Sequence, residues 1–162
     1  MEKCIFCEIA KGNSPAHKIW ESKTHLAFLS IFPNTKGVTV VIPKKHLPSY
    51  VFDNHDDDIS ELMKAGKRAS SLLVKTFKNS SRVGAVFEGF GINHLHLKLF
   101  PLHNTLGEWQ PRISGQDLKK IKYEEYPGYI STHDCERESD ELLDEISKAI
   151  RENDSETPYG EH

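Results

Sequence analysis

Two histidines and a lysine alternate with leucines in one short stretch of the chain. His94, His96 and Lys98 are separated by single leucines, and in a β-strand successive side chains point to opposite faces of the sheet. The pattern predicts a strand over Ile92–Phe100 with one aliphatic face and one face of imidazole and ammonium groups, spaced about 7 Å apart. Pro101 lacks the backbone donor of a sheet ladder, and we expect it to end this strand.

A Cys-x-x-Cys pair stands near the start of the sequence. Cys4 and Cys7 suit a metal knuckle, a redox pair or two free thiols, and three cysteines in all do not suggest a disulfide framework. Two cysteines with two histidines suffice for a tetrahedral zinc ion. We take His46 and His94, at the edges of two predicted strands, as the other ligands, although spacing alone leaves any of the nine histidines open. The redox interpretation is less favoured, because no strand precedes the pair as in a thioredoxin-like site.

With His94 assigned to the metal, His96 is free for other chemistry. A neutral imidazole beside a phosphorus atom can act as a nucleophile and form a covalent intermediate that water resolves. Lys98, on the same predicted face, could hold phosphate charge and disfavour protonation of His96; a solvated lysine at a strand end is the alternative. The backbone amides near Gly89 and Gly91 could approach an anion, but the same glycines also suit a plain hairpin turn.

The remaining pattern predicts the elements that position these residues. In chain order they are a helical turn at 4–11, strands at Ala16–Trp20, His25–Ile31 and Val38–Pro43, a helix from Asp56 to Phe77, strands at Arg82–Glu88 and Ile92–Phe100, and a helix over Asp140–Arg151. This order indicates an α+β fold in which one long helix and a C-terminal helix accompany an antiparallel meander sheet.

Length and composition are those of an ordinary globular chain. The 162 residues fit one domain, with 37% hydrophobic and 28% charged residues. A net charge of −3 lacks the basic footprint of a nucleic-acid-binding protein. No apolar run approaches the ~18 residues of a transmembrane helix, and the first residues lack the apolar core of a signal peptide. We therefore expect a cytoplasmic protein without a nucleic-acid or membrane partner.

Several motifs together resemble the histidine triad nucleotide-binding family. The resemblance runs in order over residues 4–101 and rests on Cys-Ile-Phe-Cys at 4–7, Leu-Ala-Phe-Leu at 26–29, Ile-Pro-Lys-Lys-His at 42–46 and His-Leu-His-Leu-Lys at 94–98. It implies an α+β fold, a homodimer whose sheets join, and hydrolysis or transfer at the α-phosphorus of nucleoside 5′-phosphate derivatives, such as phosphoramidates or dinucleoside polyphosphates. We accordingly expect a histidine-triad-like domain at 1–102, a C-terminal extension at 103–152 whose helix packs on it, and a flexible tail at 153–162.

The resemblance also implies roles for individual residues. His96 matches the nucleophile of the family. The ligands of a structural zinc ion match Cys4, Cys7, His46 and His94. The positions that usually wall the base pocket match Ile5, Phe6, Ile9 and Phe28.

Three features depart from the family pattern. Lys98 stands in place of the third histidine, and Phe90-Gly91 replaces a Gln-Ser pair that helps to hold the phosphate, in a loop that is also shorter. Ser30 stands where an acidic residue commonly binds the ribose hydroxyls, a loss that costs about 1–3 kcal/mol of binding. Two functions therefore stay open. The first is a nucleotide phosphoramidase or hydrolase with a nucleotidyl-His96 intermediate, and the second is a zinc-stabilised nucleotide-binding or adaptor module that has lost catalysis.

Overall fold

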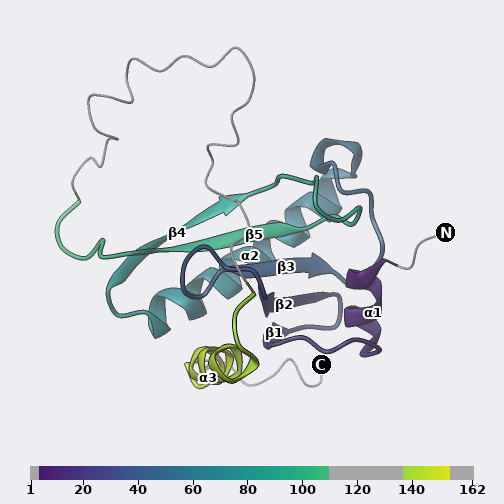
Figure 1. The fold of residues 1–162 in the computed structure, drawn as a ribbon. Helices are drawn as coiled ribbons and strands as arrows, with labels where there is room; N and C mark the ends of the chain where they lie inside the picture. The colour runs from purple at the N-terminus through teal and green to yellow at the C-terminus, as the bar shows by residue number, and fades with distance from the viewer. Residues whose placement is uncertain (1–3, 110–136, 154–162) are drawn as a thin grey trace, which may run out of the picture.

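A five-stranded antiparallel sheet forms the centre of the computed structural model, which describes residues 4–109 and 137–153 (Figure 1). In chain order the elements are α1 (Ile5–Lys11), β1 (Lys18–Glu21), β2 (His25–Leu29), β3 (Thr39–Pro43), the 3-10 helix η1 (Val51–Asp53), α2 (Asp56–Thr76), β4 (Ser80–Val86), β5 (Leu97–His103) and α3 (Asp140–Arg151). The predicted α+β fold with one long and one C-terminal helix is confirmed. Most of the predicted extension, Cys135 and the tail beyond residue 153 lie outside the described residues.

The strand order is β1-β2-β3-β5-β4. The first three strands form the expected meander, whereas β4 lies at the far edge of the sheet and β5 returns between β3 and β4. The predicted antiparallel pairing of the last two strands is present, with Ala85 opposite Leu99. Since β5 is an inner strand, the segment that leads into it lies next to the end of β3, its neighbour in the sheet.

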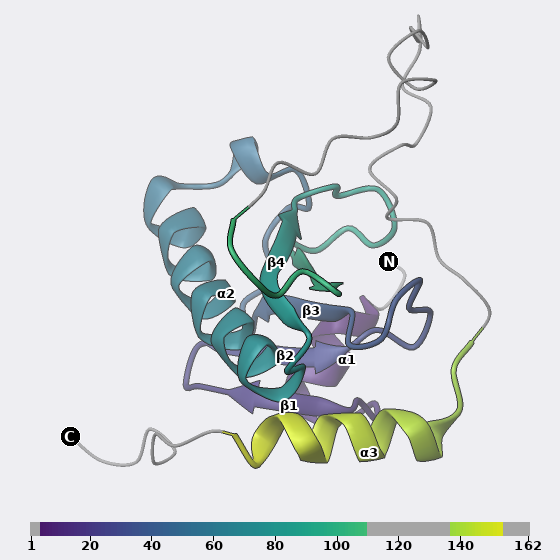
Figure 2. The same ribbon diagram turned by 90° about the vertical axis from the view of Figure 1, so that its left-hand side faces the viewer.

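The sheet separates two apolar clusters. On one face α2 covers Leu97 and Leu99 of β5, and α3 packs beside α2 against β1 and β2 (Figure 2). On the other face Phe6 of α1 packs with Phe28 and Val40. This division follows from the alternation of side chains along a strand. None of the helices in the described part of the chain is long and apolar enough to cross a membrane.

The prediction for the strand around the two histidines was wrong at both ends. β5 begins at Leu97 rather than Ile92, because Leu95 donates its backbone N–H to Leu47, beyond the end of β3, instead of joining a ladder. Pro101 lies inside β5 rather than ending it. The pairing of β5 with β3 stops at Leu99, so Pro101 has a ladder partner on one side only, where a missing donor is tolerated.

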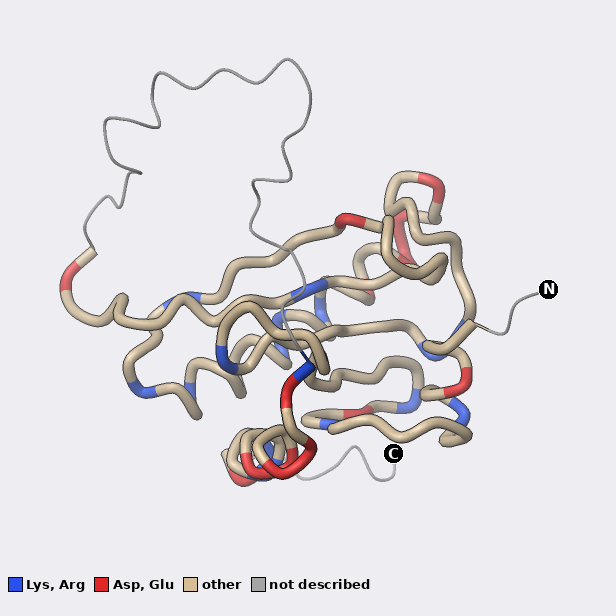
Figure 3. The backbone as a smooth tube through the Cα atoms, viewed as in Figure 1, with Lys and Arg blue, Asp and Glu red and all other residues tan. Residues whose placement is uncertain are grey.

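The other predicted boundaries lie within two residues of those observed, and η1 was not predicted. The acidic run Asp56–Asp58 forms the first turn of α2, where carboxylates favour the positive end of the helix dipole. Acidic residues also gather along α3 (Figure 3).

Helix α3 is attached to the body of the protein by apolar and polar contacts. Its side chains Leu143, Ile146 and Ile150 belong to the larger apolar cluster. Near its start, Asp144 and Asp140 contact the two ring nitrogens of His17 at 2.7 and 3.2 Å. The helix therefore completes the core on the side of β1 and β2.

We expect Ile150→Ala to lower the free energy of unfolding by about 2–4 kcal/mol, because the substitution leaves a cavity at a fully buried position. Urea denaturation would measure the change. The exposed position Glu145 on the same helix provides the control, since Glu145→Ala should stay within about 0.5 kcal/mol of the wild type. Equal effects of the two substitutions would contradict the docking of α3.

Burial lowers the pKa of His25, whose side chain at the start of β2 is 7% exposed. Below the ordinary value of 6.5, the unfolded chain binds a proton that the folded protein does not, so stability falls as the pH decreases through that value. Denaturation curves between about pH 8 and about pH 5.5 should therefore show a smaller loss of stability for His25→Gln than for the wild type. Parallel pH profiles for the two proteins would exclude this contribution.

Candidate functional site

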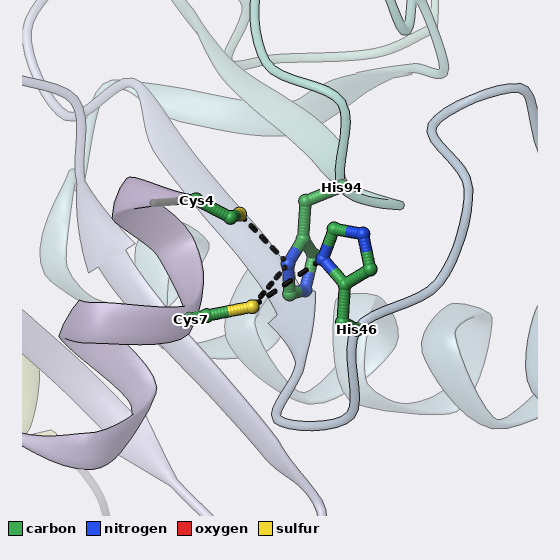
Figure 4. A group of neighbouring side chains, drawn as sticks. All are labelled: Cys4, Cys7, His46 and His94. Atoms are coloured by element: carbon green, nitrogen blue, oxygen red, sulfur yellow. Dashed lines mark hydrogen bonds between the residues drawn. The ribbon is translucent and has the colours of Figure 1, made fainter. Parts of the chain in front are cut away.

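Four of the predicted site residues meet where α1 approaches the segments that follow β3 and precede β5. One donor atom from each of Cys4, Cys7, His46 and His94 lies within 4.8 Å of every other (Figure 4). Cys4 immediately precedes α1 and Cys7 lies in its first turn. His46 lies three residues after the end of β3, and His94 lies three residues before the start of β5. The fold therefore brings together the donor set that the sequence analysis assigned to a metal.

The spacing of these donors suits a tetrahedral ion. The Cys7 sulfur lies 3.3 Å from Nδ1 of His46 and 3.6 Å from Nδ1 of His94, and the Cys4 sulfur lies 3.4 Å from Nδ1 of His94. With ordinary zinc–sulfur and zinc–nitrogen bond lengths and tetrahedral angles, a sulfur and a nitrogen on the same ion are about 3.6 Å apart. The cluster could therefore hold a metal ion with little rearrangement.

The ring of His94 is oriented for ligation. Its Nε2 donates a hydrogen bond to the carbonyl oxygen of Pro43 at 2.9 Å, so Nδ1 carries the lone pair that faces both sulfurs. Metal-binding histidines are commonly held in this way by a bond from the other ring nitrogen. Burial, followed by the neighbouring Cys4, raises the pKa of the Cys7 thiol, and a cation is what would favour a thiolate there.

His96 is buried beside this cluster and is 3% exposed. Its Nδ1 donates to the carbonyl oxygen of His94 at 2.7 Å, which leaves the lone pair on Nε2, and the ring of Phe6 packs edge-on at 5.5 Å. Burial is the main cause that lowers the pKa of His96. The charge of Lys98 adds to it, whereas the bond to His94 and the charge of Glu88 oppose it. The balance of these causes favours the neutral form of the imidazole, in which Nε2 carries the lone pair.

Lys98 lies in β5, opposite Val40 on one side and Val86 on the other. Because it alternates with leucines of the α2 face, its side chain belongs to the same face as α1. Its Nζ lies 3.6 Å from Oε2 of Glu88. Glu88 was not among the predicted site residues. Its position follows from the pairing of Val86 with Lys98, which no local sequence signal indicates.

The predicted wall of the base pocket is mostly apolar core. Phe6, Ile9 and Phe28 are buried together, with the two phenylalanine rings in edge-on contact at 5.6 Å, whereas Ile5 is 44% exposed. Among these residues Phe6 also contacts the rings of His94 and His96, so it links the apolar cluster to both histidines.

The predicted phosphate and ribose positions lie in turns. The hydroxyl oxygen of Ser30 accepts a hydrogen bond from the backbone of Phe32 at 3.2 Å, just after β2. Gly89 has φ 78°, and a Cβ there would lie 2.9 Å from the carbonyl oxygen of Ser49, so the backbone itself requires a glycine. A Cβ at Gly91 would meet no atom within 4 Å. The backbone geometry thus explains why a glycine stands at position 89, without any role in binding an anion.

Comparisons with known proteins place most of the chain in one family. Residues 11–105, more than half of the chain, match the HIT domain family. An uncharacterized HIT-like protein of Methanocaldococcus jannaschii is 35% identical over 112 residues, which cover 65% of this chain and 83% of that protein. Adenosine 5′-monophosphoramidase hnt1 of Schizosaccharomyces pombe is 30% identical over 127 residues, covering 73% of this chain and 92% of the enzyme.

A solved structure shows the same fold. The hypothetical histidine triad nucleotide-binding protein of Sulfolobus tokodaii superposes with a TM-score of 0.69 at 25% identity, covering 92% of this chain and 90% of that one. The family match, the relatives and the shared architecture all concern the part of the chain that carries the two histidines. The chain belongs to the HIT domain family.

Proposed function

We propose that the protein hydrolyses nucleoside 5′-phosphate derivatives at the α-phosphorus through a covalent nucleotidyl-His96 intermediate. The observation that carries this proposal is the 2.7 Å hydrogen bond from Nδ1 of His96 to the carbonyl oxygen of His94, which leaves Nε2 as the nucleophile. The similarity to an adenosine 5′-monophosphoramidase supports a phosphoramidate as one substrate.

The reaction has two steps. In the first, Nε2 of His96 attacks the α-phosphorus, the bond from phosphorus to the leaving group breaks, and the leaving group departs with a proton taken from solvent. In the second, water attacks the same phosphorus and gives a proton back to solvent, the phosphorus–nitrogen bond breaks, and the nucleoside monophosphate is released with His96 restored. Lys98 stabilises charge on the phosphoryl oxygens in both steps, with the amides near Gly89 and Gly91 as further donors.

The remaining assignments of the site belong to the same proposal. The base lies against the apolar group Ile5, Phe6, Ile9 and Phe28, with Ser30 on the ribose side. Cys4, Cys7, His46 and His94 hold a structural zinc ion, which fixes the start of the chain to the ends of two strands. The outer edge of β4 has no partner strand among the described residues, and we propose that it joins the sheet of a second copy in a homodimer.

A nucleotide-binding module without catalysis is the second candidate. The observation that favours it is the ion pair between Lys98 and Glu88, at a position where a third histidine is expected. The engagement of Ser30 in its own turn adds to this case, since its hydroxyl oxygen already accepts a bond from Phe32. Binding of AMP without turnover would identify this function.

We expect His96→Ala to reduce the turnover of adenosine 5′-phosphoramidate by about a thousandfold or more, because it removes the attacking atom. Release of AMP, followed by chromatography, measures the effect. The exposed His55 provides the control, and His55→Ala should retain the wild-type rate. Equal turnover in the wild type and the His96 variant would refute the mechanism. Calorimetric binding of AMP by an inactive wild type would support the second candidate.

Metal analysis of the purified protein should find about one zinc ion per chain, since the four donors complete one tetrahedral set. Removal by a chelator should lower the melting temperature by about 5–15 °C, because the ion ties the start of the chain to β3 and β5. Cys4→Ser should lose the metal, whereas the control His55→Ala should keep it. A melting temperature unchanged by the chelator would contradict a structural metal.

A further inference from the structure

Glu88 pairs with Lys98, which follows the proposed nucleophile His96 by two residues, and the two proposed steps do not use this carboxylate. It follows β4 by two residues, and Val86, at the end of that strand, lies opposite Lys98. Its Oε2 lies 3.6 Å from Nζ of Lys98, with the two side chains 28% and 19% exposed. The carboxylate and the ammonium group are therefore both partly shielded from water.

The Oε2 atom of Glu88 has an unused capacity to accept a hydrogen bond. It is shielded from solvent, and within residues 4–109 and 137–153 it has no hydrogen-bond partner. A shielded acceptor without a donor is unfavourable, so a molecule that brings an N–H group to this point would gain a hydrogen bond. The same carboxylate would repel a molecule that brings further negative charge.

We propose that Glu88 determines which leaving group the site accepts. Its carboxylate receives a hydrogen bond from the nitrogen of an amine or amide attached to the α-phosphorus, and it disfavours a polyphosphate in the same place. Lys98 meanwhile holds the charge of the α-phosphate, which every substrate shares. The inference rests on the proposed function and adds to it a preference for phosphorus–nitrogen over phosphorus–oxygen–phosphorus bonds.

The carboxylate could instead be only the partner of Lys98 in a surface ion pair. Partly exposed pairs contribute little to stability, and such a pair would not distinguish between two substrates. The relative rates for two leaving groups of different charge separate these roles. If the carboxylate discriminates between the substrates, its removal changes the ratio of their rates. If it only forms a structural ion pair, its removal changes both rates together or only the melting temperature.

The test compares kcat/KM for adenosine 5′-phosphoramidate and for diadenosine tetraphosphate in the wild type and in Glu88→Gln. Glutamine keeps the size and one acceptor oxygen but removes the charge. In Glu88→Gln we expect kcat/KM for the tetraphosphate, divided by kcat/KM for the phosphoramidate, to be about fivefold to tenfold higher than in the wild type. This increase in the ratio should be smaller at higher salt concentration, because mobile ions screen the repulsion between the carboxylate and the tetraphosphate.

The matched control is Glu145→Gln, which removes the same charge from the exposed surface of α3 and should leave the ratio unchanged. An unchanged ratio in Glu88→Gln, or an equal shift in the control, would overturn the inference while the proposed function stands. Failure of the wild type to turn over either substrate would overturn the proposed function and the inference with it.

Discussion

His94 connects the four potential metal ligands to the proposed nucleophile through two parts of the same residue. Its ring is fixed by the carbonyl oxygen of Pro43 and faces the sulfurs of Cys4 and Cys7, while its own carbonyl oxygen holds the N–H of His96. A rotation of the backbone at this residue would disturb both hydrogen bonds at once. The orientation of the proposed nucleophile thus depends on the same short segment that presents a potential metal ligand.

That segment can bend in this way because it is not part of the sheet. β5 begins only at Leu97, and the residues before it bond to the end of β3 and to the segment that follows it. A regular ladder would have occupied the carbonyl of His94 with a neighbouring strand. Leaving the ladder makes that carbonyl available to His96. The inner position of β5 still anchors the segment, because Leu97 and Leu99 are buried against α2.

Local patterns in the sequence were sufficient to predict the three α-helices, most strand boundaries and the two cysteine candidates. The Cys-x-x-Cys spacing and the alternation around His96 are local signals, and the family resemblance resolved which of the histidines belong together. The errors arose from pairings between distant segments. Pro101 can lie inside β5 because the pairing of β3 with β5 stops at Leu99. The contact of Glu88 with Lys98 depends on the register of β4 against β5. Neither is encoded within a window of a few residues.

Phe6 shows why the start of the chain matters for the chemistry of the site. Helix α1 has only 7 residues, too few for a stable helix in isolation, so its position depends on contacts with the sheet and on the cysteines at its first turn. Phe6 uses that position to pack against Phe28 and, at the same time, against the ring of His96. Part of the burial that lowers the pKa of His96 therefore comes from α1. A metal bound by Cys4 and Cys7 would act on the proposed nucleophile through this packing, without contact with the substrate.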